Sequence, residues 1–267
     1  MSKGVKDAVR QAANVLGAIF QIVAPTLAGP AIGRVSSENP TLVVPGDYAF
    51  VIWSPIFALA LVYAVYQALP ANRENPFLRR IGWFSALAYF SNGVWELLFP
   101  AREFALSQVV FVGIFAGAVI AFLLAQRGAD PERRVDLWLI APAFGLLAGW
   151  VTAAFFVGFA TVLVATGVLN GGIGEAVLGA LLLIAGGAVA CAVILAGRDG
   201  PAHGYLAYGA AVLWALVGVF ANQYQASLIT ASTAVVCALL VAAVLFVARR
   251  RSSAARGSGQ PSRPRVA

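Results

Sequence analysis

Long stretches without a single charged side chain run through most of this sequence, and they decide what the chain can fold into. One such stretch covers residues 104–126, another covers residues 137–165, and a third covers residues 204–248. About 20 predominantly apolar residues are enough to cross the hydrocarbon core of a bilayer as a helix. Because lipid offers peptide groups no hydrogen-bond partner, each crossing segment must be helical. The sequence therefore predicts an all-α integral membrane protein.

The composition agrees with a membrane protein and argues against a soluble one. Only 11% of the residues are charged and 61% are hydrophobic, whereas a soluble domain carries about 25% charged residues. A net charge of +7 can indicate nucleic-acid binding, but here the basic residues lie in short loops and in the C-terminal tail. No folded basic domain is predicted that could bind nucleic acid, so we do not expect nucleic acid as a partner.

Proline and glycine divide the chain into a bundle of about eight transmembrane helices. The predicted spans are residues 12–32, 48–69, 81–99, 104–126, 137–165, 174–196, 204–221 and 226–248. After the last span the composition changes to Ser, Arg, Gly and Pro. This change predicts a disordered, basic cytoplasmic tail at residues 249–267.

An even number of spans places both termini on one side of the membrane, and the basic residues indicate that this side is the cytoplasm. With the N-terminus inside, all 18 Lys and Arg residues except Arg34 and Arg102 fall on the cytoplasmic side, as the positive-inside rule expects. The expected location is the cell (inner) membrane.

One alternative concerns the first span, which could imitate a cleavable signal peptide. Pro30 beside the only plausible cut argues against cleavage. Cleavage would leave seven spans, but a retinal protein is excluded even then. Lys3 and Lys6 are the only lysines and neither lies in a span, so no Schiff-base lysine is available.

No pattern for catalysis or metal binding is visible in the sequence. Cys191 and Cys237 lie alone inside apolar runs, where a thiol acts as a small hydrophobic group. There is no CxxC pair, no Cys/His cluster, and no GxSxG, HExxH, Walker or Rossmann motif. We therefore expect no metal, no cofactor, no catalytic residue and no enzymatic activity.

The segment at residues 45–57 opens the second span from the outer face and carries the first candidate binding residues. Phe50, Trp53 and Phe57 follow one another at i, i+3 and i+7, which places them in one aromatic stripe on a helix. Tyr48 stands at the membrane interface, where an amphipathic ring is favoured in any case. It is either an interfacial anchor or part of a binding site.

The third span carries Asn92, Trp95 and Glu96 at i, i+3 and i+4, which places them on one helical face. An acid inside a span is a functional hypothesis by default, so Glu96 could orient a ligand or move a proton. By helical rise it lies about 6 Å from the outer end of the span, where it could instead pair with Arg102 or Arg34. We favour this second interpretation because of that shallow depth.

The fifth span contains a proline, a pattern of small residues and a tryptophan. Gly145 and Gly149 form a small-xxx-small pair that lets a neighbouring helix approach closely. Pro142 is expected to kink the helix near its cytoplasmic start. Trp150 directly follows the second glycine.

Together these segments resemble the tryptophan-rich sensory protein family, also called the translocator protein (TspO/MBR) family. The Pro-rich, Trp-containing opening of the family's second helix resembles residues 45–53, its Asn-x-x-Trp pattern resembles residues 92–95, and its Pro…Trp segment resembles residues 142–150. Two features depart from the common pattern: Tyr48 stands where Trp is commonest, and no Asn follows Trp150 within residues 155–158.

The resemblance covers about residues 10–168 and implies a fold and a binding site. It implies a TspO-like five-helix membrane domain at residues 1–168. The three additional transmembrane helices predicted within residues 169–248 lie beyond this five-helix core. Members of the family bind tetrapyrroles and other flat hydrophobic molecules among five helices. By resemblance, with Glu96 added as a further candidate, the ligand-binding residues are Tyr48, Phe50, Trp53, Asn92, Trp95, Glu96 and Trp150.

These observations predict a membrane protein that binds a flat hydrophobic ligand, tetrapyrrole-like or sterol-like, as a sensor, regulator or carrier. The first alternative is a proton-coupled small-molecule transporter that uses Glu96. The second is a porphyrin-degrading membrane enzyme, for which the sequence shows no catalytic set. A purely structural membrane subunit is also left open. The expected partners are the lipid bilayer and the ligand, and a homodimer is left open.

Overall fold

The computed structural model describes residues 2–28, 31–169 and 171–257, and within these ranges the protein contains helices and no strand. The predicted all-α fold is confirmed. The long helices are α1 (Lys3–Ala28), α3 (Trp53–Ala68), α4 (Pro76–Leu98), α5 (Phe104–Gly128), α6 (Ala141–Ala165), α7 (Gly172–Gly197), α8 (Ala202–Gln223) and α9 (Leu228–Gly257). The shorter elements are α2 (Ala31–Glu38), the 3₁₀ turns η1 (Asp47–Ile52) and η2 (Pro70–Asn72), and the π-helical turn η3 (Asp136–Ile140).

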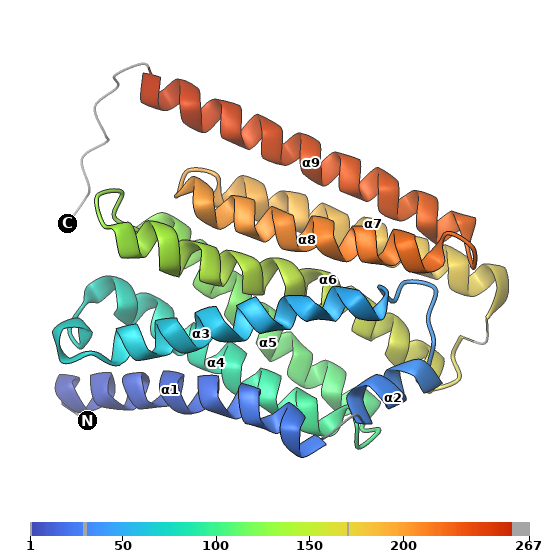
Figure 1. The fold of residues 1–267 in the computed structure, drawn as a ribbon, viewed down its shortest axis with the longest axis horizontal. Helices are drawn as coiled ribbons and strands as arrows, with labels where there is room; N and C mark the ends of the chain where they lie inside the picture. The colour runs from blue at the N-terminus through green and yellow to red at the C-terminus, as the bar shows by residue number, and fades with distance from the viewer. Residues whose placement is uncertain (1, 29–30, 170, 258–267) are drawn as a thin grey trace.

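Seven of the long helical segments are long and apolar enough to cross a membrane, and the chain is a multi-pass membrane protein. The long helix outside this group is α4, in which Arg79, Arg80, Asn92 and Glu96 lower the mean hydropathy. It nevertheless packs against both α1 and α5. In Figure 1, α1 begins at the same end of the bundle at which α9 ends, as an even number of crossings requires. Which side of the membrane this end faces stays a prediction.

The helices differ from the prediction most clearly at α1, in the first loop and at α9. The first helix begins at Lys3 rather than at residue 12, because Asp7 and Arg10 are buried in the bundle instead of lying in a loop. The loop that follows it contains the short helix α2, which was not predicted. The last helix continues to Gly257, since residues 249–256 contain neither Gly nor Pro to stop it. The rest of the predicted disordered tail, residues 258–267, lies outside the described residues.

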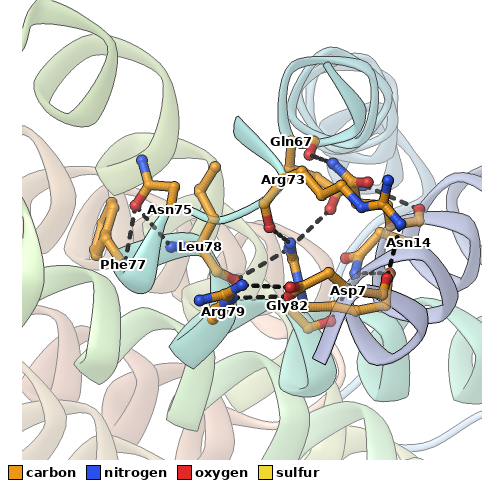
Figure 2. Close-up of polar contacts among 12 residues, drawn as sticks. Asp7, Asn14, Gln67, Arg73, Asn75, Phe77, Leu78, Arg79 and Gly82 are labelled. Carbon is orange, nitrogen blue, oxygen red and sulfur yellow. Dashed lines mark hydrogen bonds and ion pairs between the residues drawn. The ribbon is translucent and has the colours of Figure 1, made fainter. Parts of the chain in front are cut away.

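Figure 2 shows a polar network that joins α1, α3 and α4 near the end of the bundle where α1 begins. At its centre is Arg10, which is only 1% exposed. Its guanidinium donates hydrogen bonds to Gln67 Oε1 at 3.1 Å and to the Arg73 carbonyl oxygen at 2.9 Å. The carboxylate of Asp7 lies 3.7 Å from Arg10 Nε and also accepts hydrogen bonds from Arg79. A buried charge is tolerated when it is paired and hydrogen-bonded in this way.

A second set of contacts in this network brings the backbones of α1 and α4 close together. Asn14 donates a hydrogen bond to the Gly82 carbonyl oxygen at 2.6 Å, and its own side-chain oxygen accepts one from Ser85. A Cβ atom at Gly82 would lie 2.7 Å from Arg10 Cδ. A larger residue at position 82 would therefore collide with the side chain of Arg10, which lies against this glycine.

The predicted small-residue pair of the fifth span is used between α6 and α8, whose backbones approach closely. A Cβ atom added at Gly145 would lie 2.2 Å from the Gly204 carbonyl oxygen, and one added at Gly149 would lie 2.2 Å from the Tyr208 carbonyl oxygen. One turn further along, the hydroxyls of Thr152 and Tyr208 are hydrogen-bonded at 2.9 Å. These contacts fix α8 against α6 with no room for a larger residue.

Pro142 lies near the start of α6, which continues without a break from the π-helical turn η3. Within a continuous helix proline lacks the N–H that would pair with an earlier carbonyl oxygen, and the kink predicted at this residue stays a prediction. The π-helical turn η3 comes directly before this position. The chain thus changes its hydrogen-bond spacing just ahead of the proline.

Candidate functional site

A cavity of about 460 Å³ extends from the first loop toward the middle of the bundle. This loop lies at the end opposite the one where α1 begins (Figure 1). The start of α3 and the end of α4 supply one part of the wall, and the middle portions of α6, α7 and α8 supply the other. Helix α2 and the residues after it contribute the cover. Binding cavities for small molecules commonly measure about 300–1,000 Å³, so the space suits a ligand.

One aromatic group on the cavity wall combines the start of α3 with α6. The ring of Trp53 stacks on Phe57 with centroids 5.1 Å apart. Trp150 meets Phe50 and Trp53 edge to face, at centroid distances of 5.6 and 6.2 Å. The 3₁₀ turn η1 continues into α3 at Trp53, and it carries Phe50 to the same cavity. The α3 stripe predicted from the sequence therefore lines a cavity together with Trp150.

A second aromatic group lies on α4 and α5. Trp95 stacks on Phe99 with centroids 5.2 Å apart, one helical turn away, and meets Phe111 edge to face at 5.6 Å. All three residues line the cavity. Aromatic pairs in these arrangements contribute about 0.5–1.5 kcal/mol each beyond the area that they bury, so the rings are held in defined orientations.

Two side chains on the wall carry buried polar atoms that have no hydrogen-bond partner within the described part of the chain. Glu96 is 4% exposed, and its Oε1 accepts a hydrogen bond from Asn92 at 3.1 Å, while Oε2 has no partner. Trp150 is 2% exposed, and its indole N–H has no acceptor. Buried polar groups are nearly always hydrogen-bonded in proteins, so each is a candidate contact for a ligand.

The favoured sequence interpretation of Glu96, an ion pair with Arg102 or Arg34, is wrong. Arg102 forms its ion pair with Glu38 at the end of α2, and Arg34 lies 4.0 Å from the same carboxylate. Both arginines therefore meet an acid of the first loop. Glu96 remains buried in the bundle, where its carboxyl group binds Asn92.

The structure brings five of the seven predicted site residues to the cavity wall and leaves two outside it. The residues on the wall are Phe50, Trp53, Trp95, Glu96 and Trp150. Tyr48 is 50% exposed and meets Trp214 edge to face at 5.8 Å, on the outer side of η1. Asn92 lies behind the wall, where it donates hydrogen bonds to Glu96 and to Gln21. It can act on a ligand only through Glu96.

No feature of the sequence indicates that α7 and α8 line the cavity. Leu182 and Gly186 on α7, and Val212 and Leu216 on α8, form the wall opposite the aromatic groups. A leucine or glycine in an apolar run looks the same whether it faces lipid or a cavity. Only the small-residue pair of α6 pointed to a close neighbour, and it did not identify that neighbour as α8.

The loop that covers the cavity is hydrogen-bonded to α7 and α8. The backbone N–H of Leu42 donates to Glu175 at 3.0 Å, and Gln223 donates to the carbonyl oxygens of Thr41 and Val44 at 3.2 and 3.1 Å. The indole N–H of Trp214 donates to the Ala49 carbonyl oxygen at 2.8 Å. Side chains of the later helices thus satisfy backbone groups of the early loop, a role that no spacing in the sequence indicates.

Within the ranges that the structure describes, no three His, Cys, Asp or Glu residues come together as a metal site. Cys237 is a buried thiol beside the Leu183 carbonyl oxygen, and Cys191 is a second free thiol on α7. The chemistry of the cavity is therefore that of aromatic faces, one buried carboxyl group and one indole N–H.

The fold and the cavity together define a multi-pass helical membrane protein with an aromatic-lined internal site. A family model described as TSPO-like protein matches residues 10–247, and the chain belongs to this family. The match continues past residue 168 through α7 and α8 and into α9, beyond the part of the chain that carries the three motifs. Comparisons with curated proteins and with solved structures give no match.

Proposed function

We propose that the protein binds a flat hydrophobic molecule, tetrapyrrole-like or sterol-like, in this cavity and acts as its sensor, regulator or carrier. The observation that carries the proposal is the cavity of about 460 Å³, which is lined by two stacked aromatic pairs. Membership of the TSPO-like family supports a binding role in the membrane. Apolar walls with a few placed polar groups suit a ligand of this kind.

The two aromatic groups explain how a planar ligand would be held. Trp53 and Trp95 belong to different helices, and each is stacked on a phenylalanine one turn away. A rigid ring that is already oriented loses little conformational entropy when a ligand stacks on it. The orphan polar atoms of Glu96 and Trp150 would then fix the ligand's polar edges. Binding by these groups requires no catalytic step.

The test is a titration of the purified, detergent-solubilised protein with protoporphyrin IX and with its neutral dimethyl ester, followed by tryptophan fluorescence. We expect saturable quenching with at least one of them. Trp53→Leu and Trp95→Leu remove an aromatic face worth about 1 kcal/mol, so each Kd should rise about fivefold. Trp138→Leu is the matched control, because Trp138 is 67% exposed and lies outside the cavity. Quenching that never saturates, or equal effects of all three variants, would overturn the proposal.

A pair of neighbouring leucines on α7 tests whether the later helices form part of the site. Leu182 lines the cavity, whereas Leu181 is 56% exposed on the outside of the bundle. Leu182→Trp should place a large ring in the ligand's space and raise Kd at least tenfold, or about 1.4 kcal/mol. Leu181→Trp adds the same ring on the outer surface and should leave Kd within about twofold. Equal affinities of the two variants would mean that the ligand does not reach α7.

Proton-coupled transport is the second candidate, and the burial of Glu96 favours it. An acid inside a membrane protein commonly marks a pathway for an ion or a substrate. Carriage and sensing differ in one measurement, the uptake of ligand into protein-containing liposomes. Uptake that follows a proton gradient and is lost in Glu96→Gln would establish transport, and binding without uptake would leave the sensor or regulator.

A further inference from the structure

The ionisable side chains that line the cavity are both carboxylic acids. Among the described residues, the ionisable side chains on its wall are Asp47, which is exposed at the start of η1, and Glu96, which is buried on α4. No Lys, Arg or His of the described chain lines it. A cavity with low-dielectric walls and charges of one sign concentrates ligands of the opposite charge. The wall chemistry therefore favours a positively charged ligand.

No basic side chain of the described protein neutralises Glu96. Its one hydrogen-bond partner is the neutral amide of Asn92. The two arginines of the neighbouring loops, Arg34 and Arg102, both meet Glu38. A carboxylate taken out of water without a cationic partner is costly, and pairing offsets part of this cost. The carboxyl group of Glu96 thus has no cationic partner within the described protein, and a positively charged ligand could supply one.

Aromatic faces accompany this carboxyl group on the same helix. Trp95 precedes Glu96 directly in the chain, and Phe99, on which Trp95 stacks, follows one turn later. Both rings line the cavity with Glu96. The face of an indole attracts a cation within about 6 Å of its centroid, and aromatic cages use this attraction to recognise ammonium groups.

We infer that the cavity binds its ligand through a positively charged group, a protonated amine held between the Glu96 carboxylate and the aromatic faces of Trp95 and Phe99. This inference rests on the proposed function, because it names the polar end of the same hydrophobic ligand. The N–H of the amine donates to Glu96 Oε2, the atom without a partner. The unpaired indole N–H of Trp150 gives the same ligand a donor for a carbonyl or ether oxygen. A ligand carboxylate would offer Glu96 neither an N–H donor nor a positive charge.

The experiment compares three porphyrins that share one ring and differ in charge. They are protoporphyrin IX with two carboxylates, its neutral dimethyl ester, and its diamide with terminal dimethylamino groups, which are protonated at pH 7. Each is titrated against the full-length protein in a non-ionic detergent, with protein-free micelles as the reference for partitioning. We expect the diamide to bind most tightly and the dicarboxylate least tightly, with at least a tenfold difference in Kd between them.

Glu96→Gln tests which side chain produces this ranking. The variant should reduce the tenfold preference for the cation to about threefold or less, while the Kd of the neutral ester stays within about twofold. Retained binding of the ester also shows that the variant is folded. Glu103→Gln is the matched control, because it removes the same charge from an exposed residue near the same helix end and outside the cavity. It should keep the full preference.

The outcomes separate this inference from the function on which it rests. If the ester binds saturably but the three porphyrins have equal Kd values, the charge preference is overturned and the hydrophobic site stands. If the preference persists in Glu96→Gln, the assignment to Glu96 is overturned. If none of the three binds saturably, the proposed function fails and the inference fails with it.

Discussion

Replacing Gly145 and Gly149 together by leucine should prevent α6 and α8 from docking, so that little or no monodisperse protein is recovered in mild detergent. At each residue even a Cβ atom would lie 2.2 Å from a backbone carbonyl oxygen of α8. A backbone atom cannot rotate away as a side chain can, so the helices must separate. Overpacking of a core costs about 1–3 kcal/mol per site and occasionally more. Two such sites on one interface together cost about 2–6 kcal/mol, which reaches the lower end of the stability of a typical domain, about 5–15 kcal/mol.

Size-exclusion chromatography of the solubilised protein measures this effect, and Gly174→Leu supplies the control. Gly174 belongs to α7, and a Cβ atom placed there would have nothing within 4 Å. The control should elute as the wild-type protein does. If the Gly145→Leu, Gly149→Leu double variant also elutes as a sharp wild-type peak, the close approach of α6 and α8 is incorrect.

Arg10→Met should lower the free energy of unfolding by about 3–5 kcal/mol, the usual cost of removing one partner from a buried ionic network. Methionine fills much of the same space but leaves Gln67 Oε1 and the Arg73 carbonyl oxygen without their donor. The variant also takes a positive charge from beside Asp7, which retains Arg79. The lost hydrogen bonds and ion pair are among the contacts that hold α1 against α3 and α4.

Equilibrium unfolding in mixed micelles of mild and denaturing detergent measures this change, with Lys6→Met as the control. Lys6 lies one turn before Arg10 on α1, but its side chain is exposed. Its replacement removes the same charge and should change the free energy of unfolding by less than about 0.5 kcal/mol. Equal stabilities of the two variants would show that the buried arginine does not hold α1 in place.

Much of the fold could be predicted because the bilayer imposes a strict rule on the backbone. A charge-free run that must cross lipid has to be helical, so α5 and α6 were located from sequence alone. The start of α1 was missed because Asp7 and Arg10 look like residues of a solvated loop until α3 and α4 are present to bind them. The hydropathy of α4 is lowered by Arg79 and Arg80 near its start and by the buried Asn92 and Glu96. Its aromatic pattern indicates the helix better than its composition does.

Site residues could be predicted where the helical repeat places them on one face of a helix. They could not be predicted where their position depends on contacts with other helices. The stripe of Phe50 and Trp53 was found because residues three apart lie on one side of both a 3₁₀ and an α-helix. Asn92 lies on the same helical face as Glu96, but it does not line the cavity. The spacing of residues along a helix does not show which members of one face reach a cavity. The pairing of Arg102 was predicted wrongly because the alternative acid, Glu38, lies in a loop whose helical turn was not foreseen.

The wall on α7 and α8 had no sequence signature at all. Leu182 and Leu181 are identical neighbours, and only the packing of α7 against α6 and α9 decides which of them meets the cavity. The match of the family model to residues 10–247 includes these helices, but a match over a range does not assign a role to a residue. The boundary predicted at residue 168 stays a prediction, and the cavity draws on residues from both sides of it.

The hydrogen bonds between the first loop and the last helices have a consequence for how the protein is made. A ribosome delivers the loop early, but the Glu175 and Gln223 side chains that hold it are delivered more than a hundred residues later. Until α7 and α8 have been inserted, Glu38 of the loop can already pair with Arg102, but residues 41–44 lack the side chains that bind their backbone groups, and the cavity has only part of its wall. The proposed ligand would therefore find a complete site only after α7 and α8 have been made.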